Sequence, residues 1–145
     1  MCRPHDPDLA AACRAALWLR HDFLHESHTI SQEIESSEGS YWHGIMHRRE
    51  PDPENSKYWF QRVGQHAVYE PLRKAAAELA SAAQPERATE FLVSQAVWDP
   101  YRWIDLCEAA RSGQTAKTVA DLCCQIQLRE WQLLFDYCHR GACQA

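Results

Sequence analysis

Three Asp-Pro dipeptides mark helix starts along the chain, at Asp6-Pro7, Asp52-Pro53 and Asp99-Pro100. An aspartate at the N-cap accepts hydrogen bonds from free backbone amides, and a proline suits the first helical position because its missing N–H has no intrahelical partner there. Glycines that can end helices in a left-handed conformation follow periodic segments, at Gly64, Gly113 and Gly141. No stretch shows sustained β alternation between hairpin turns. These signals predict an all-α protein.

The same marks predict a compact single-domain bundle of about six to seven helices over residues 1–145. The length is usual for one domain, and 46% hydrophobic residues are enough to fill one core. We expect the helices at about residues 7–34, 41–49, 53–63, 70–83, 86–97, 100–111 and 115–139. We expect Ser40 to cap the second of these helices.

Five histidines and a glutamate fall at helical spacing on the first two of these segments. They are His21, His25 and His28 on the first segment, and His43, His47 and Glu50 on the second. Side chains three, four and seven residues apart share one face of a helix. The short ESSEGS turn makes the two segments antiparallel neighbours, because short connections join elements that pack together. Donors from both helices can therefore converge on one point.

This cluster predicts a site for a divalent metal ion, with zinc or iron preferred, held by His28, His43, His47 and Glu50. His28 is the first candidate on its helix because it lies at the edge of the apolar stripe. A bound ion lowers the pKa of water toward about 7, and Glu50 would act as ligand or general base. The segment is not the HExxH zinc-protease motif, since Gly44 replaces its glutamate. Histidines on amphipathic helices are also often structural, which is the alternative.

Cations alternate with aromatic residues directly after the histidines. The residues are Arg48, Arg49, Asn55, Lys57, Tyr58, Trp59, Phe60 and Arg62. Guanidinium groups recognise carboxylates and phosphates, and aromatic faces pack against the apolar surface of a ligand. We therefore expect Arg48, Arg49, Asn55 and Tyr58 to bind a small anionic substrate. The alternative is a solvated helix face on which the arginines pair with local acidic groups.

The last predicted helix carries a carboxylate, Glu130, in the middle of its apolar stripe. A buried charge needs a partner, and Arg20 in the stripe of the first helix is the expected one, ahead of a metal ion. A second apolar line runs along the same helix through Cys124, Leu128, Trp131 and Phe135. Such a helix is either central to the bundle or half of a homodimer interface, and the sequence favours neither.

Composition excludes several classes of function. A net charge of −5 with scattered basic residues disfavours binding to nucleic acid. No apolar run reaches the roughly 20 residues that cross a bilayer, and no signal core follows the N-terminus, so we expect a soluble, cytoplasmic protein without a membrane partner. Seven cysteines without a CxxC pair indicate reduced thiols. The nucleophile elbow and the glycine-rich phosphate loop are both missing.

The segment SYWHGIMHRREPDPENSKYWFQRVGQHAVYEPL resembles a family of small, functionally uncharacterised microbial proteins with the pattern HxxxHRxExDxxNxxYW. The matching residues are His43, His47, Arg48, Glu50, Asp52, Asn55, Tyr58 and Trp59. The resemblance covers about a quarter of the chain and implies site positions, without a reaction. The segment is also similar to one tetratricopeptide unit, but further copies are missing, which disfavours a repeat scaffold.

Two hypotheses follow from the sequence. The first is a metal-dependent hydrolase that acts on a small anionic substrate, with the metal held by the histidine and glutamate side chains. The second is a non-enzymatic interaction protein or scaffold, in which the histidines are structural and the apolar line of the last helix contacts another chain.

Overall fold

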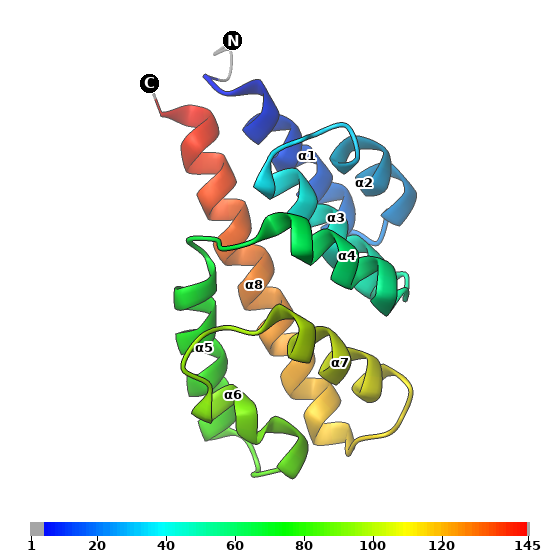
Figure 1. Ribbon diagram of the computed structural model, residues 1–145, viewed down its shortest axis with the longest axis vertical. Coiled ribbons are helices and arrows are strands. Elements are labelled where there is room, and N and C mark those ends of the chain that lie inside the picture. The colour runs from blue at the N-terminus through cyan, green and yellow to red at the C-terminus, as the bar shows by residue number, and fades with distance from the viewer. Residues whose placement is uncertain (1–4, 145) are drawn as a thin grey trace. The chain divides into compact units, whose positions relative to one another are not determined.

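The computed structural model describes residues 5–144 and is all-α over them, which confirms the predicted class (Figure 1). Its elements are α1 (Pro7–Arg20), α2 (Leu24–Ser31), α3 (Ser37–Arg49), α4 (Pro53–Val63), α5 (Tyr69–Ala82), the 3-10 helix η1 (Arg87–Thr89), α6 (Glu90–Ser94), α7 (Pro100–Arg111) and α8 (Lys117–Cys143). Among the described residues, no helix has the length and apolar character needed to cross a membrane.

The three Asp-Pro dipeptides begin helices as predicted. The side chain of Asp6 accepts from two backbone amides at 3.0 Å, that of Asp52 from the Asn55 amide at 3.2 Å, and that of Asp99 from two amides at 3.0 and 3.1 Å. The helices α4 and α7 therefore have the predicted bounds.

Two of the three glycines follow helix ends with left-handed backbones, at φ 66° for Gly64 and φ 76° for Gly113. The prediction for Gly141 is wrong, because α8 continues through it to Cys143. A Cβ atom at Gly141 would lie 2.4 Å from Cδ1 of Leu9, so this glycine allows α1 and α8 to approach closely. Its role is packing between helices.

The predicted first helix, residues 7–34, is wrong as one element because the chain breaks after Arg20. Asp22 takes the left-handed conformation at φ 66°, which aspartate tolerates better than most residues. The break turns α2 onto a new axis. Leu17 on α1 and Phe23 just before α2 are 47% and 49% exposed.

Other boundaries also move. The third helix begins at Ser37, and its cap is Ser36, whose hydroxyl accepts from the Gly39 amide at 3.4 Å, so the prediction of Ser40 as the cap is wrong. The predicted helix at residues 86–97 is replaced by the short elements η1 and α6. Ala-rich α5 begins and ends one residue earlier than expected.

The described chain divides into two compact units, each with its own internal contacts. Unit 1 comprises the residues up to His66 together with those from Leu134 onward, and unit 2 comprises Ala67–Leu133. The long helix α8 thus contributes its C-terminal part to unit 1 and the rest to unit 2. That the chain behaves as one domain stays a prediction.

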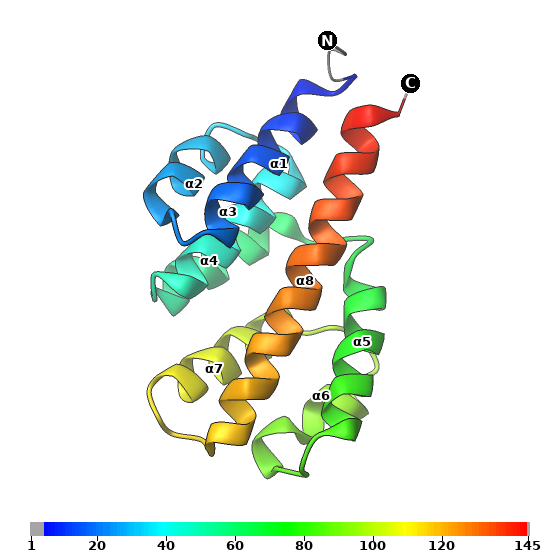
Figure 2. The ribbon, with the colours of Figure 1, turned by 180° about the vertical axis from the view of Figure 1, so that it is seen from behind.

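Unit 1 holds α1 to α4 and the C-terminal part of α8, which lies beside α1 in both views (Figure 2). Its core is built around Leu19, Tyr41, Trp42 and Phe60, each at most 1% exposed. Helices α3 and α4 approach closely at Gly44, because a Cβ atom there would lie 2.7 Å from Cε2 of Phe60. The buried hydroxyl of Ser56 donates to the Gly44 carbonyl at 2.7 Å and fixes the same crossing.

Unit 2 encloses Glu130, which is fully buried on α8. The indole nitrogen of Trp103, also fully buried, donates to Oε1 of Glu130 at 3.3 Å. The expected partner, Arg20, is exposed, so its predicted place in a buried stripe is wrong. A carboxylate that accepts hydrogen bonds from a buried donor avoids part of the cost of burial.

Candidate metal centre

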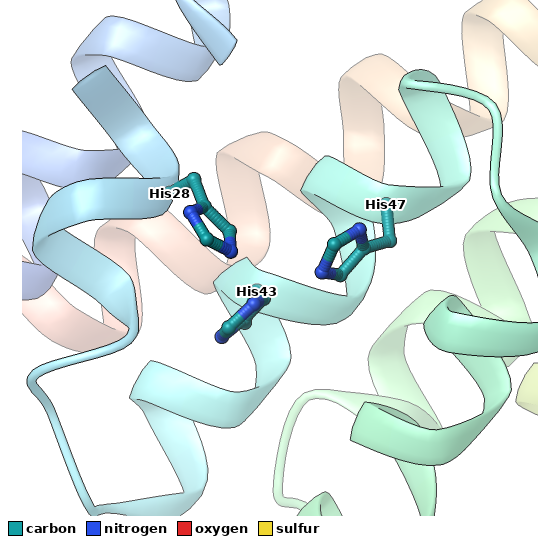
Figure 3. Close-up of side chains that lie close together, drawn as sticks. All are labelled: His28, His43 and His47. Atoms are coloured by element: carbon teal, nitrogen blue, oxygen red, sulfur yellow. The ribbon is translucent and has the colours of Figure 1, made fainter. Parts of the chain in front are cut away.

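The side chains of His28, His43 and His47 converge in unit 1 (Figure 3). The ring centroids lie 4.6 Å apart for His28 and His43, 5.4 Å for His28 and His47, and 4.8 Å for His43 and His47. One nitrogen from each ring lies within 4.8 Å of the others. Nitrogens bound to one tetrahedral zinc ion are about 3.4 Å apart, given bonds of about 2.0–2.1 Å. The three nitrogens would have to move closer by about an ångström to share one ion.

Two elements supply these rings. His43 and His47 are four residues apart on α3, so they lie on one face one turn apart, and their rings are stacked at 24°. His28 comes from α2 and meets both rings edge-on, at 88° and 74°. Convergence thus depends on how α2 is held over α3.

Arg49, the last residue of α3, holds the turn that positions α2. Its Nη1 donates to the Leu19 carbonyl at 2.5 Å, and its Nη2 forms an ion pair with Asp22, the left-handed residue of the turn. Burial lowers the pKa of Arg49, and Asp22 counteracts that shift. Two donors of Arg49 are thus used in the turn between α1 and α2. Its expected role in binding substrate stays a prediction.

Glu50 contacts His47 directly. The Nδ1 atom of His47 lies 2.6 Å from Oε2 of Glu50, and a carboxylate can only accept there, so Nδ1 carries the proton. The other nitrogen, Nε2, then has its lone pair free. The sequence grouped Glu50 with the histidines as a ligand, whereas the structure places it on the far nitrogen of His47. Such a contact orients a metal-binding histidine.

His43 is the most deeply buried member of the cluster, at 3% exposed. Its Nδ1 atom is buried and has no hydrogen-bond partner among the described residues. The ring stacks on Trp59 with centroids 3.7 Å apart and planes 16° apart. The Arg62 guanidinium also lies over Trp59, 5.3 Å from the ring centroid. An unpaired buried nitrogen is costly, which makes His43 a strong candidate ligand.

Burial keeps two of the imidazoles in the form that binds metal. Desolvation, aided by His47 and His28, lowers the pKa of His43 to about 3. Desolvation and His47 also lower the pKa of His28, against a smaller opposing effect of Glu50. Both rings are therefore neutral at pH 7, and a neutral ring carries the lone pair that a metal needs.

A pocket of about 430 Å³ opens beside the cluster. Its walls are formed by Leu24, His25, His28, Met46, His47 and Glu50. His28 and His47 thus face the pocket, and the buried His43 does not contribute to its wall. An ion between the three rings would have protein on the His43 side and open space on the pocket side.

The other two clustered histidines have different positions. His21 is exposed at the end of α1, beyond the break, so the expectation that it shares a helix face with His28 is wrong. His25 is exposed on α2 and lines the rim of the pocket without joining the three-histidine group. The break at Asp22, which the sequence pattern does not predict, places His21 on α1 and His25 on α2.

The remaining predicted substrate residues surround the site unevenly. Arg48 is buried at 7% exposed and is not part of the pocket wall. The amide nitrogen of Asn55 lies 3.5 Å from Nδ1 of His47. Tyr58 is 50% exposed and meets the Trp59 ring edge-on. Substrate binding by these side chains stays a prediction.

Asp52 also lies close to the site, because its carboxylate, that of Glu50 and a nitrogen of His47 lie within 4.8 Å of one another. Asp52 caps α4, and its backbone N–H donates to the His47 carbonyl at 2.6 Å. The Asp-Pro signal identified the cap, but the proximity to His47 could be found only from the folded chain.

The apolar line on α8 is partly exposed. Leu128 is 41% exposed and Cys124 is exposed, whereas Trp131 and Phe135 are half-buried. The homodimer stays a prediction. The six described cysteines are free, in agreement with the expectation of reduced thiols, and Cys2 lies outside the described residues.

A scan against protein-family models, a search of curated proteins and a search of solved structures found no match to this chain. The resemblance to the microbial HxxxHRxExDxxNxxYW family therefore stays a prediction.

Proposed function

We propose that unit 1 binds one divalent transition-metal ion through His28, His43 and His47, with Glu50 orienting His47, and that the loaded centre is hydrolytic. The observation that carries the proposal is the buried Nδ1 atom of His43, which has no hydrogen-bond partner among the described residues and belongs to a ring beside two others. A bond from this nitrogen to an ion would remove the cost of leaving it unpaired.

The three imidazole donors limit which metal ions fit the site. Three neutral imidazoles without a thiolate suit zinc or iron, and three protein ligands with one open position are typical of catalytic zinc. A bound ion would polarise a substrate oxygen or activate water. Glu50 lines the same pocket, and its Oε2 atom is occupied by His47. Its other carboxylate oxygen would serve as the general base.

Elemental analysis of protein purified without a nickel column tests metal binding. We expect about one equivalent of zinc or iron per chain, and less than a tenth of it after His28→Ala. His28 is only half-buried, so this variant should keep the fold, which circular dichroism would verify. His43→Gln provides a second test at the most buried ligand.

The matched control is His21→Ala, which removes an exposed histidine outside the cluster and should leave the metal content unchanged. The metal proposal would be wrong if folded wild-type protein stayed metal-free after dialysis against micromolar zinc, or if His21→Ala and His28→Ala lost metal equally. If the metal-loaded protein hydrolysed none of a panel of esters, amides and phosphoesters, the proposed metal binding would stand but the proposed hydrolytic activity would be wrong.

A further inference from the structure

The direction of the open coordination position follows from the unequal burial of the three histidines. His43 lies behind the site at 3% exposed, whereas His28 and His47 form part of the pocket wall. An ion held by all three has its remaining position on the side away from His43. That side is the pocket of about 430 Å³, which has room for a small organic molecule.

The charge of the pocket selects the ligand class. A divalent ion with three neutral imidazoles carries two positive charges, and Glu50 in the pocket wall supplies one negative charge. No lysine or arginine is among the lining residues, and Arg49 is directed to Leu19 and Asp22. Counted over the ion and the pocket wall, one positive charge is left over, which a monoanion neutralises, whereas a phosphate dianion would find no lysine or arginine there.

The pocket wall also contains two apolar side chains. Leu24 is half-buried at the start of α2, and Met46 on α3 is 3% exposed. They lie beside the metal ligands on both helices, so a group attached to a metal-bound atom would meet them. Burying such a group gains about 0.8 kcal/mol per methylene, or about fourfold in affinity.

We propose that the open position binds a small monocarboxylate whose short apolar chain packs on Leu24 and Met46. This inference rests on the proposed metal centre, because the carboxylate oxygen needs the ion. It gives the proposed hydrolase a substrate class in which a carboxylate is substrate or product, namely short-chain acyl compounds.

Cobalt(II) is the probe, because its visible absorption changes when the fourth ligand changes. We expect protein loaded with one equivalent of cobalt to respond to acetate and to butyrate, with butyrate bound about tenfold more tightly, and to inorganic phosphate more weakly than to butyrate. Leu24→Ser should reduce the preference for butyrate to threefold or less while cobalt still binds. Leu17→Ser, the same change at an exposed leucine outside this pocket, should keep the preference.

The outcomes separate the two proposals. If cobalt is not bound, the metal centre and this inference both fail. If cobalt is bound but carboxylates leave the spectrum unchanged, or acetate and butyrate bind equally, only the carboxylate inference fails. Tighter binding of phosphate than of butyrate, or an unchanged preference in Leu24→Ser, would also overturn it.

Discussion

The three histidines are fixed in place by different interactions. A carboxylate holds His47, an aromatic face holds His43, and His28 depends on the path of the backbone through the turn before α2. These differences matter for binding, because a ligand ring that is already oriented loses less freedom when the ion arrives. Glu50 is a support that can be altered at the surface, since its side chain is 51% exposed.

Glu50→Ala should weaken zinc binding about 10–100-fold, which is the usual effect of removing a carboxylate behind a metal-bound histidine. Glu50→Gln should lose only a few-fold, because the amide oxygen can still accept from Nδ1 of His47. Competition titration with a chromophoric chelator would measure both. Glu54→Ala removes an equal charge from an exposed neighbour and should have no effect. Equal losses for Ala and Gln would instead make Glu50 a ligand.

At the scale of elements, the crossing of α3 and α4 is the contact that supports the site. Gly44 lies between the two histidines of α3, and the Phe60 ring occupies the space where its side chain would be. The sequence pattern showed only that Gly44 replaces the glutamate of the HExxH zinc-protease motif. Its structural role is to let the helix that carries Trp59 come close enough to stack on His43.

Gly44→Ala should therefore lower the free energy of unfolding by about 1–3 kcal/mol, since the new Cβ would lie 2.7 Å from a ring that is 1% exposed. Helix propensity alone predicts the opposite sign, a gain of about 1 kcal/mol. Urea denaturation would decide between them. In the double variant Gly44→Ala/Phe60→Leu, the free energy of unfolding should fall by less than the sum of the two single decreases. The reason is that leucine leaves space for the new Cβ atom.

Local sequence signals predicted the helices whose capping residues lie next to them in the sequence. Helices α4 and α7 follow from an aspartate and a proline, and the spacing of His43 and His47 needs only a regular helix. The break after Arg20 could not be predicted in this way, because apolar residues continue through it and its geometry depends on Arg49, far along the chain. For the same reason the sequence grouped His21 with His28 on one helix face, and it missed the contact of His43 with Trp59.

At the scale of the whole molecule, the candidate centre belongs entirely to unit 1, and unit 2 holds no member of it. Unit 2 has a separate buried polar feature, Glu130 with Trp103. A ligand that binds one unit stabilises that unit directly, and the other gains only as far as the two unfold together. Metal binding thus reports on whether the chain is one cooperative domain.

Free zinc at a concentration 100 times its dissociation constant should stabilise the folded, zinc-binding state by about 2.7 kcal/mol. We expect hydrogen exchange to slow by up to about 100-fold at the Trp42 and Ile45 amides of α3, with little change at Trp103 and Ile104 of α7. Mass spectrometry of peptic fragments, with His28→Ala as the zinc-insensitive control, would measure the difference. Equal protection of α3 and α7 would support the single-domain prediction.

Unit 1 is assembled from the two ends of the described chain, since α1 packs on the last turns of α8 at Leu9 and Gly141. During synthesis the ribosome releases all three histidines long before it has made the stretch from Leu134 onward. The nascent polypeptide therefore lacks one wall of the unit that carries the site until that stretch has been made. We expect native packing of this unit, and with it an ordered metal centre, to wait until the residues from Leu134 onward have left the ribosome.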